Sequence, residues 1–105
     1  MEIRIPTKLQ VGGMEVNIVY EDLMNYGDTC GECSVGGGYI KLAKNIRAGA
    51  QSETSQQNTF VHELVHCILD TMGKPDLSAD EQFVCSFAGF LLEAVKSMEF
   101  TERTW

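Results

Sequence analysis

The sequence predicts an α+β fold, in which a small antiparallel β-sheet packs on two main helices. Residues 8–19 alternate between apolar and polar side chains on either side of Gly12-Gly13, which is typical of a β-hairpin. Two later stretches, from about residue 54 to 72 and from about residue 79 to 98, repeat their apolar residues with the period of a helix. We expect all 105 residues to form a single domain.

The sheet is expected to contain the hairpin and one further strand. That strand is predicted at Tyr39–Ala43, after the glycine run at residues 36–38. Residues 20–35 have no clear period, which predicts an irregular connection. Residues 45–55 are small and polar, and they predict a loop.

The first helix is expected to begin near Thr54, with Gln57 as a capping partner three residues on. It should stop at Gly73, just before Pro75. Its apolar side chains fall on one arc and predict the face that packs in the core: Val61, Leu64, Val65, Ile68, Leu69 and Met72.

The second helix is expected to be capped by Ser78, with Glu81 completing a capping box. It carries a wide apolar face, made of Phe83, Val84, Phe87, Ala88, Phe90, Leu91, Ala94 and Val95. The mostly polar tail from Glu99 to Trp105 is expected to fray.

Composition and charge narrow the class of protein. Hydrophobic residues make up 44 % of the chain, enough for one modest core. The formal net charge of −7 argues against a nucleic-acid surface, which needs clustered Lys and Arg. The chain contains no apolar run long enough for a membrane span, and its N-terminus lacks the pattern of a secretory signal. We therefore expect a soluble, cytoplasmic protein.

The four cysteines are expected to be reduced in that compartment. Cys30 and Cys33 form a single C-x-x-C in a Gly-rich region, and a structural zinc site would need two more ligands. We interpret this pair as loop residues rather than as a metal or redox site. Cys67 and Cys85 lie within apolar helical patterns and are predicted to be small core residues.

The most informative motif is His62-Glu63-Leu64-Val65-His66, which contains both histidines of the chain. Residues four apart lie on the same face of a helix, so the two imidazoles can bind one zinc ion. Glu63 lies about 100° round the helix from His62, where it can act as general base toward a water on that metal.

A catalytic zinc needs a third protein ligand, which here must be a carboxylate or a cysteine. Glu81 lies fifteen residues after His66, near the start of the second helix, which can fold back antiparallel. Asp80 is a rival on nearly the same grounds, and Asp76 and Asp70 are weaker candidates. Glu81 also has a purely structural explanation, as the capping partner of Ser78. Spacing alone leaves this choice open.

The motif and the second helix together resemble the zincin-like metallopeptidases of phages and mobile elements, of the ImmA/IrrE type. Those proteins carry H-E-x-x-H and then a helix that reads roughly E-x-x-A-x-x-F-A-x-x-L-L. The pattern here departs at Val84, where the family has a small alanine. The positions that correspond to this pattern are Glu81, Val84, Phe87, Ala88, Leu91 and Leu92, and the resemblance covers about residues 8–98.

The resemblance implies a minimal zincin-like domain whose first helix carries the motif. It implies that His62, His66 and Glu81 bind Zn²⁺ and that Glu63 is the general base. The implied function is a zinc-dependent metallopeptidase that hydrolyses a peptide bond in a protein or peptide substrate, without a nucleic-acid or membrane partner. The alternative is a catalytically inactive zinc-binding interaction module of phage or mobile-element origin.

Three further assignments stay open at this point. Tyr39 and Tyr26 are candidates to stabilise an oxyanion, but the pattern does not choose between them. The strand at Tyr39–Ala43 is a candidate sheet edge that either pairs with an extended substrate or is only structural. Asp70 either orients an imidazole or is solvated.

Overall fold

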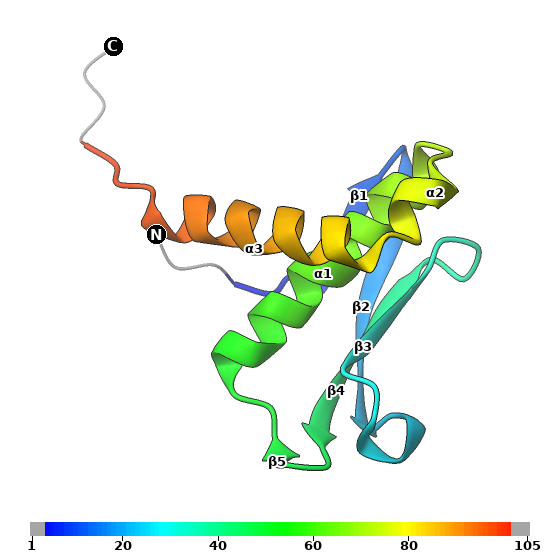
Figure 1. Cartoon of the computed structure of the whole chain (residues 1–105), viewed down its shortest axis with the longest axis vertical. Coiled ribbons are helices and arrows are strands. Elements are labelled where there is room, and N and C mark those ends of the chain that lie inside the picture. Colours follow the sequence, from blue (N-terminus) through cyan, green and yellow to red (C-terminus); the bar gives the residue numbers. More distant parts are fainter. Residues whose placement is uncertain (1–3, 102–105) are drawn as a thin grey trace.

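The computed structural model describes residues 4–101 of the chain (Figure 1). Within these residues, five strands form one mixed sheet beside three α-helices, which confirms the α+β class. The strands are β1 (Lys8–Val11), β2 (Met14–Leu23), β3 (Gly31–Ser34), β4 (Tyr39–Ile46) and β5 (Gly49–Ala50). The helices are α1 (Glu53–Thr71), α2 (Pro75–Ser78) and α3 (Glu81–Ser97), with a short 3-10 turn, η1, at Asn25–Gly27.

The predicted hairpin is present as β1 and β2. Gly12 and Gly13 form its turn with φ angles of 60° and 81°, the left-handed conformation that a two-residue hairpin turn of this kind requires. Strand β2 continues to Leu23, well past the predicted end at residue 19. The prediction ended too early because the last residues of β2 are exposed and carry no apolar alternation.

The prediction of an antiparallel sheet is wrong. The strand order is β1-β2-β4-β3, and β2 pairs with β4 in parallel, with Asn17 opposite Tyr39. Strand β3 was not predicted; it pairs antiparallel with β4 and occupies the sheet edge. Burial explains this order: β4 contributes Ile40, Leu42 and Ala43 to the core and needs cover on both sides, whereas the polar β3 tolerates the edge.

Helix α1 packs on the sheet, and α3 packs on α1. Helix α1 packs against β1, β3 and β4, and α3 packs on α1 and α2 (Figure 1). The C-terminal part of α3 extends away from the sheet in Figure 1. Fully buried side chains from all three layers meet in one core: Val16, Ile40, Leu42, Cys67 and Val84.

The predicted apolar faces are only partly buried. On α3 the buried side chains are Val84, Ala88 and Leu92, while Phe87 and Phe90 are 50 % and 72 % exposed. Ile68 on α1 and Met72, which follows the last residue of α1, are exposed as well. The main neighbours of α3 are the helices α1 and α2, and none of them is a strand. One side of the wide apolar face of α3 is therefore not covered by any other part of residues 4–101.

Helix α1 begins at Glu53, within one residue of the predicted start, and α3 begins at Glu81, two residues after the predicted Ala79, but both predicted caps are wrong. Ser52 caps α1, and its Oγ accepts the backbone N–H of Ser55 at 3.1 Å, so Thr54 and Gln57 lie inside the helix. Asp80 caps α3 by accepting the N–H of Phe83 at 3.1 Å. Ser78 lies instead in α2, the short helix that Pro75 begins.

The predicted end of α1 is confirmed. Gly73 adopts a φ of 72° and donates its backbone N–H to the carbonyl of Asp70 at 3.1 Å. At the other end of the chain, residues 99–101 form no helix or strand, and the rest of the predicted fraying tail, including Trp105, lies outside the described residues.

Replacing a buried residue of β4 should destabilise the fold far more than replacing an exposed residue of α3. Leu42→Ala removes a fully buried side chain and should lower the free energy of unfolding by about 2–5 kcal/mol. Phe90→Ala should change it by no more than about 0.5 kcal/mol, because Phe90 lies on the surface. Urea denaturation of both variants measures the difference, and equal losses would contradict this packing.

Candidate metal centre

Both histidines of the motif point toward the start of α3. His62 and His66 lie one turn apart on α1, and their Nε2 atoms are 3.2 Å from each other. Both imidazoles are partly buried, with 24 % and 16 % of their side chains exposed. The packing of α3 on α1 brings the first residue of α3, Glu81, directly against them.

The carboxylate of Glu81 contacts both imidazoles. Its Oε2 lies 3.3 Å from Nε2 of His62, and its Oε1 lies 3.0 Å from Nε2 of His66. Among the carboxylates that the sequence left open, the structure therefore brings Glu81 to the histidines. The side chain of Asp80 is engaged in capping α3, and Asp70 and Asp76 are exposed.

The spacing of these donor atoms fits a small metal ion. An ion held tetrahedrally at about 2.0–2.2 Å from nitrogen and oxygen ligands needs those ligands about 3.3–3.5 Å apart. The two Nε2 atoms and the carboxylate oxygens are separated by 3.0 to 3.3 Å. Small outward shifts of the partly exposed side chains reach the required spacing, so the cluster can hold a metal ion.

The orientation of His66 is fixed by a residue that the sequence assigned to a helix cap. Nδ1 of His66 lies 3.0 Å from Oγ of Ser78, a buried residue at the end of α2. When Nδ1 carries the ring proton, it donates to Ser78, and the lone pair of Nε2 faces Glu81. The motif gave no signal for Ser78, because its partner depends on the reversal of the chain through α2.

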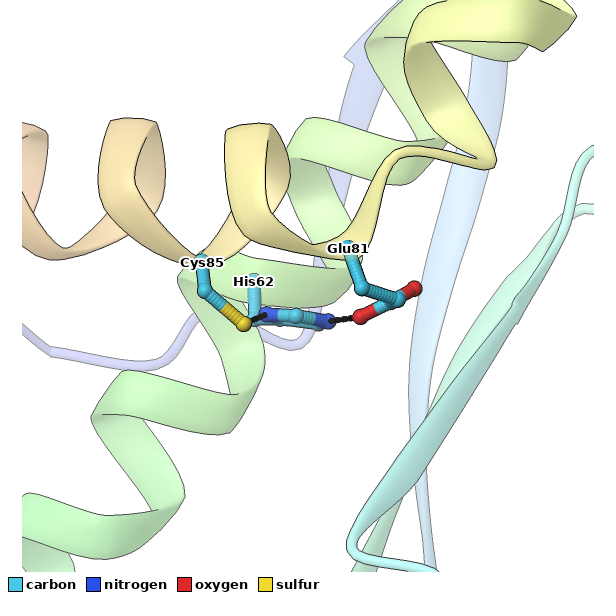
Figure 2. Close-up of side chains that lie close together, drawn as sticks. All are labelled: His62, Glu81 and Cys85. Atoms are coloured by element: carbon cyan, nitrogen blue, oxygen red, sulfur yellow. Dashed lines mark hydrogen bonds and ion pairs between the residues drawn. The ribbon is translucent and has the colours of Figure 1, made fainter.

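Cys85 is also at this centre, which corrects the prediction that it is a core residue. It is exposed, and its Sγ lies 3.8 Å from Nδ1 of His62 (Figure 2). Position 85 is about 100° round α3 from the buried Val84, so it faces the edge of His62 instead of the core. Cys67, in contrast, is fully buried as predicted.

Burial favours the neutral form of His62. Its pKa is lowered by desolvation and by the neighbouring His66, and Glu81 only partly opposes this shift. Since metals bind the neutral imidazole, this shift prepares His62 to be a ligand near neutral pH.

Glu63 lies on the wall of a cavity next to the donor cluster. The cavity has a volume of about 440 Å³ and is lined on one side by His62, Glu63 and Thr59 and on the other by Cys30 and Gly31. A Cβ at Gly31 would lie 2.6 Å from Cγ2 of Thr59 and 3.3 Å from Cγ of Glu63, so the glycine permits β3 to approach α1 closely. The pKa of Glu63 is raised by burial and, to a lesser extent, by Glu81 and Glu32, while His66 lowers it.

The buried side-chain amide of Gln51 supports the side of this cavity that Cys30 lines. Nε2 of Gln51 donates to the carbonyl oxygens of Ala43 and Cys30 at 2.7 and 3.4 Å. Its Oε1 accepts the hydroxyl of Ser55 at 2.7 Å. These bonds link β4, the segment before β3 and the first turn of α1.

The C-x-x-C pair does not form a second donor cluster. Cys33 lies in β3, not in a loop, and faces Cys67; burial and the contact with Cys67 raise the pKa of its thiol strongly. This opposes the thiolate form that binds metals. Cys30, three residues earlier, is exposed beside the cavity.

The other candidates named from the sequence lie elsewhere. Tyr26 is 85 % exposed in the left-handed turn η1, and Tyr39 lies in β4 beneath the ammonium of Lys41. Neither lines the cavity at Glu63. Strand β4 is an interior strand, so the predicted sheet edge at Tyr39–Ala43 is wrong; β3 forms that edge, beside α1.

Comparison with models of known families, with curated proteins and with solved structures gives no match for this chain. The resemblance to the ImmA/IrrE type therefore stays a prediction. Among residues 4–101, no helix combines the length and the hydropathy that crossing a bilayer requires.

Ionisation of Glu63 should destabilise the metal-free protein. Its pKa in the folded chain is raised above the ordinary value of 4.5, so the folded state holds this proton more tightly than the unfolded state. Protonated Glu63 therefore stabilises the folded state fully at a pH below that ordinary pKa, and this contribution to the free energy of unfolding is lost as the pH rises through the raised pKa.

Glu63→Gln should accordingly be more stable than the parent at neutral pH and equally stable in acid. Urea denaturation with a chelator present, repeated across this pH range, measures the difference. The exposed Glu93→Gln should show no such pH-dependent gain. A Glu63→Gln variant that is less stable than the parent at neutral pH would contradict the burial of Glu63.

Proposed function

We propose that the chain is a zinc-dependent metallopeptidase in which His62, His66 and Glu81 bind zinc and Glu63 is the general base. The observation that supports this most directly is the convergence of three donors beside a half-buried carboxylate on a cavity. Two imidazoles and a carboxylate form the His₂Glu set that zinc accepts, with a fourth position for water or substrate. Imidazole and carboxylate donors together favour zinc over magnesium or calcium, which prefer all-oxygen sites.

Each residue has a distinct role in this proposal. When bound, zinc supplies a Lewis acid that polarises the scissile carbonyl and acidifies the attacking water. Glu63 accepts the proton of that water and passes it to the leaving amine. Its raised pKa suits this exchange, because the carboxylate is more basic than an ordinary one. Ser78 keeps His66 in the ligand tautomer.

The sheet edge beside the cavity supports a peptide as the substrate. Strand β3 ends the strand order, and its outer edge pairs with no other strand among residues 4–101. Gly31 belongs both to β3 and to the cavity that Glu63 lines. An extended peptide that adds to this edge by backbone hydrogen bonds would pass next to Glu63.

The alternative is a zinc-binding interaction module that cleaves nothing. The donor group of His62, Glu81 and Cys85 favours it, because thiolate ligands are typical of structural zinc sites. Both functions predict the same metal, and they differ in what Glu63 does.

Glu63→Gln should abolish peptide cleavage while zinc stays bound. Loss of the general base should lower the rate by about 10²–10⁴-fold, since an amide cannot accept the proton. The assay is digestion of a complex peptide library by the zinc-loaded protein without a histidine tag, with new termini read by mass spectrometry. Glu93→Gln, an exposed change on α3, is the matched control and should cleave as the parent does.

Metal analysis of the same samples should find about one zinc per chain in the parent and in both variants. Removal of zinc with a chelator should stop cleavage, and zinc should restore it. Zinc binding without cleavage by the parent protein would favour the interaction module, and the absence of bound zinc would contradict both functions.

Ser78→Ala should weaken zinc binding without unfolding the protein. The change removes the hydrogen bond to Nδ1 of His66, and loss of such a partner typically costs about 10–100-fold in metal affinity. Competition with a chromophoric chelator measures the affinity, and Ser86→Ala, an exposed serine of α3, is the control. Equal affinities for the Ser78 and Ser86 variants would show that Ser78 does not support the site.

A further inference from the structure

Two cysteines that are distant in the sequence face each other between β3 and α1. Cys33 belongs to β3 and Cys67 to α1, and the two thiols are in contact. Cys67 is fully buried, whereas Cys33 packs against the same core and stays partly exposed. The proposed metal site uses neither thiol. A dithiol that joins the edge strand to the helix of the motif is therefore a separate feature of this fold.

The close approach of β3 to α1 sets this contact. A Cβ at Gly31 would lie 2.6 Å from Cγ2 of Thr59 and 3.3 Å from Cγ of Glu63. Cys33 is two residues further along the strand, about 6.6 Å away, and its side chain points to the same face as position 31. Cys67 is four residues after Glu63, about 6 Å further along the same face of α1. These two steps match, so the contact that follows Gly31–Glu63 joins Cys33 to Cys67.

Cys30, the other member of the C-x-x-C pair, is directed away from Cys33. The backbone N–H of Ala43 donates to the carbonyl oxygen of Cys30 at 2.9 Å, so the chain stays extended and paired with β4 through this residue. Residues three apart in an extended strand are about 10 Å apart and point to opposite faces. A disulfide needs Cα atoms about 4.4–6.8 Å apart. The fold therefore offers Cys67, and not Cys30, as the partner of Cys33.

We propose that Cys33 and Cys67 are a dithiol–disulfide pair that a small disulfide such as oxidised glutathione closes. The inference does not depend on the proposed zinc site. The thiolate of the partly exposed Cys33 attacks one sulfur of the oxidant, and one glutathione thiolate leaves. The thiolate of Cys67 then attacks the sulfur of Cys33, and the second glutathione thiolate leaves. The two cysteines lose two protons and two electrons, which convert one oxidised glutathione to two reduced glutathione molecules.

Burial affects the rate of this exchange more than its equilibrium. It raises the pKa of the Cys33 thiol strongly, so the reactive thiolate is scarce and the exchange is slow near neutral pH. The equilibrium depends on how readily the two sulfurs meet. The folded chain already holds them in contact, whereas the unfolded chain must close the long loop between residues 33 and 67. Folding should therefore favour the disulfide.

Peptide mapping after redox equilibration tests the pairing. The metal-free full chain is equilibrated with mixtures of reduced and oxidised glutathione and a chelator, and N-ethylmaleimide then blocks the remaining thiols. Cleavage after glutamate places each cysteine in a different peptide, because Glu32, Glu63 and Glu81 separate the four. Mass spectrometry should find a cross-linked pair of peptides that joins Cys33 to Cys67.

Two variants make this assignment specific. Cys33→Ser should lose the crosslink, and Cys30→Ser, which removes an exposed thiol three residues earlier, should form it as the parent does. A crosslink between Cys30 and Cys33 in the parent, a lasting mixed disulfide of glutathione with Cys33, or no disulfide at all would overturn the proposal.

A comparison of folded and unfolded chain tests the role of the fold. The double variant Cys30→Ser, Cys85→Ser keeps only the proposed pair of thiols. Its half-oxidation in buffer should need a ratio of oxidised glutathione to the square of reduced glutathione at least about tenfold lower than in concentrated urea. Equal ratios would show that the fold does not hold the two thiols together, and would overturn the proposal. None of these measurements uses zinc or peptide cleavage, so their failure leaves the proposed function standing.

Discussion

The contact between α1 and α3 is the constraint on which the candidate metal centre depends. The two imidazoles come from α1 and the carboxylate from α3, so the spacing of the donors is set by how these helices pack. Val84, Ala88 and Leu92 fix the rotation of α3 by entering the same buried cluster as Val61 and Val65. That rotation turns Glu81 and Cys85 toward the histidines. The reversal between the helices adds precision, because backbone bonds from Lys74 to Leu69 and from Asp80 to Leu77 tie it together. A small apolar contact therefore determines the geometry of a polar site.

The same packing brings together groups that oppose one another in the absence of a cation. Glu63 and Glu81 are close enough to raise the pKa of Glu63, and His66 lowers the pKa of His62. Desolvation is the largest cause of both shifts, and in each case it disfavours the charged form. Partly buried carboxylates and imidazoles so arranged weaken the metal-free fold locally. A divalent cation would reverse the balance, since it interacts favourably with the carboxylates and with neutral imidazoles. Such a conflict is expected at sites selected for binding more than for stability.

The sequence could predict those parts of the structure that depend on local spacing. The hairpin followed from Gly12-Gly13, and the shared face of His62 and His66 followed from the helical period. The position of β4 inside the sheet could not be predicted, because it depends on which strand most needs burial. The polar β3 carried no apolar alternation and so gave no signal.

Within the centre, the missed residues depend on tertiary geometry. The sequence left several carboxylates as candidates for the third ligand, Glu81 among them. The structure shows that Asp80 caps α3, so the side chain of that second candidate has another role. The sequence assigned Ser78 to a helix cap and Cys85 to the core. Ser78 reaches His66 only through the chain reversal, and Cys85 reaches His62 only through the rotation of α3, and neither can be inferred from spacing along the chain. Apolar neighbours in the sequence identify a helical face, but they do not show how much of that face a partner covers.

His62 stands between two cavities that approach the centre from different directions. The larger cavity, of about 440 Å³, is lined by His62 together with Glu63 and Gly31. The smaller one, of about 170 Å³, is lined by His62 together with Cys85 and Gly89. The two nitrogens of the His62 ring have different neighbours. Nε2 lies 3.2 Å from Nε2 of His66 and 3.3 Å from Oε2 of Glu81, whereas Nδ1 lies 3.8 Å from Sγ of Cys85. In the proposed site the ion binds Nε2, so Nδ1 carries the ring proton and can donate it to the thiol, as Nδ1 of His66 does to Ser78. Each imidazole therefore has a polar partner from the segment that follows α1, and that partner favours the tautomer whose Nε2 lone pair faces Glu81.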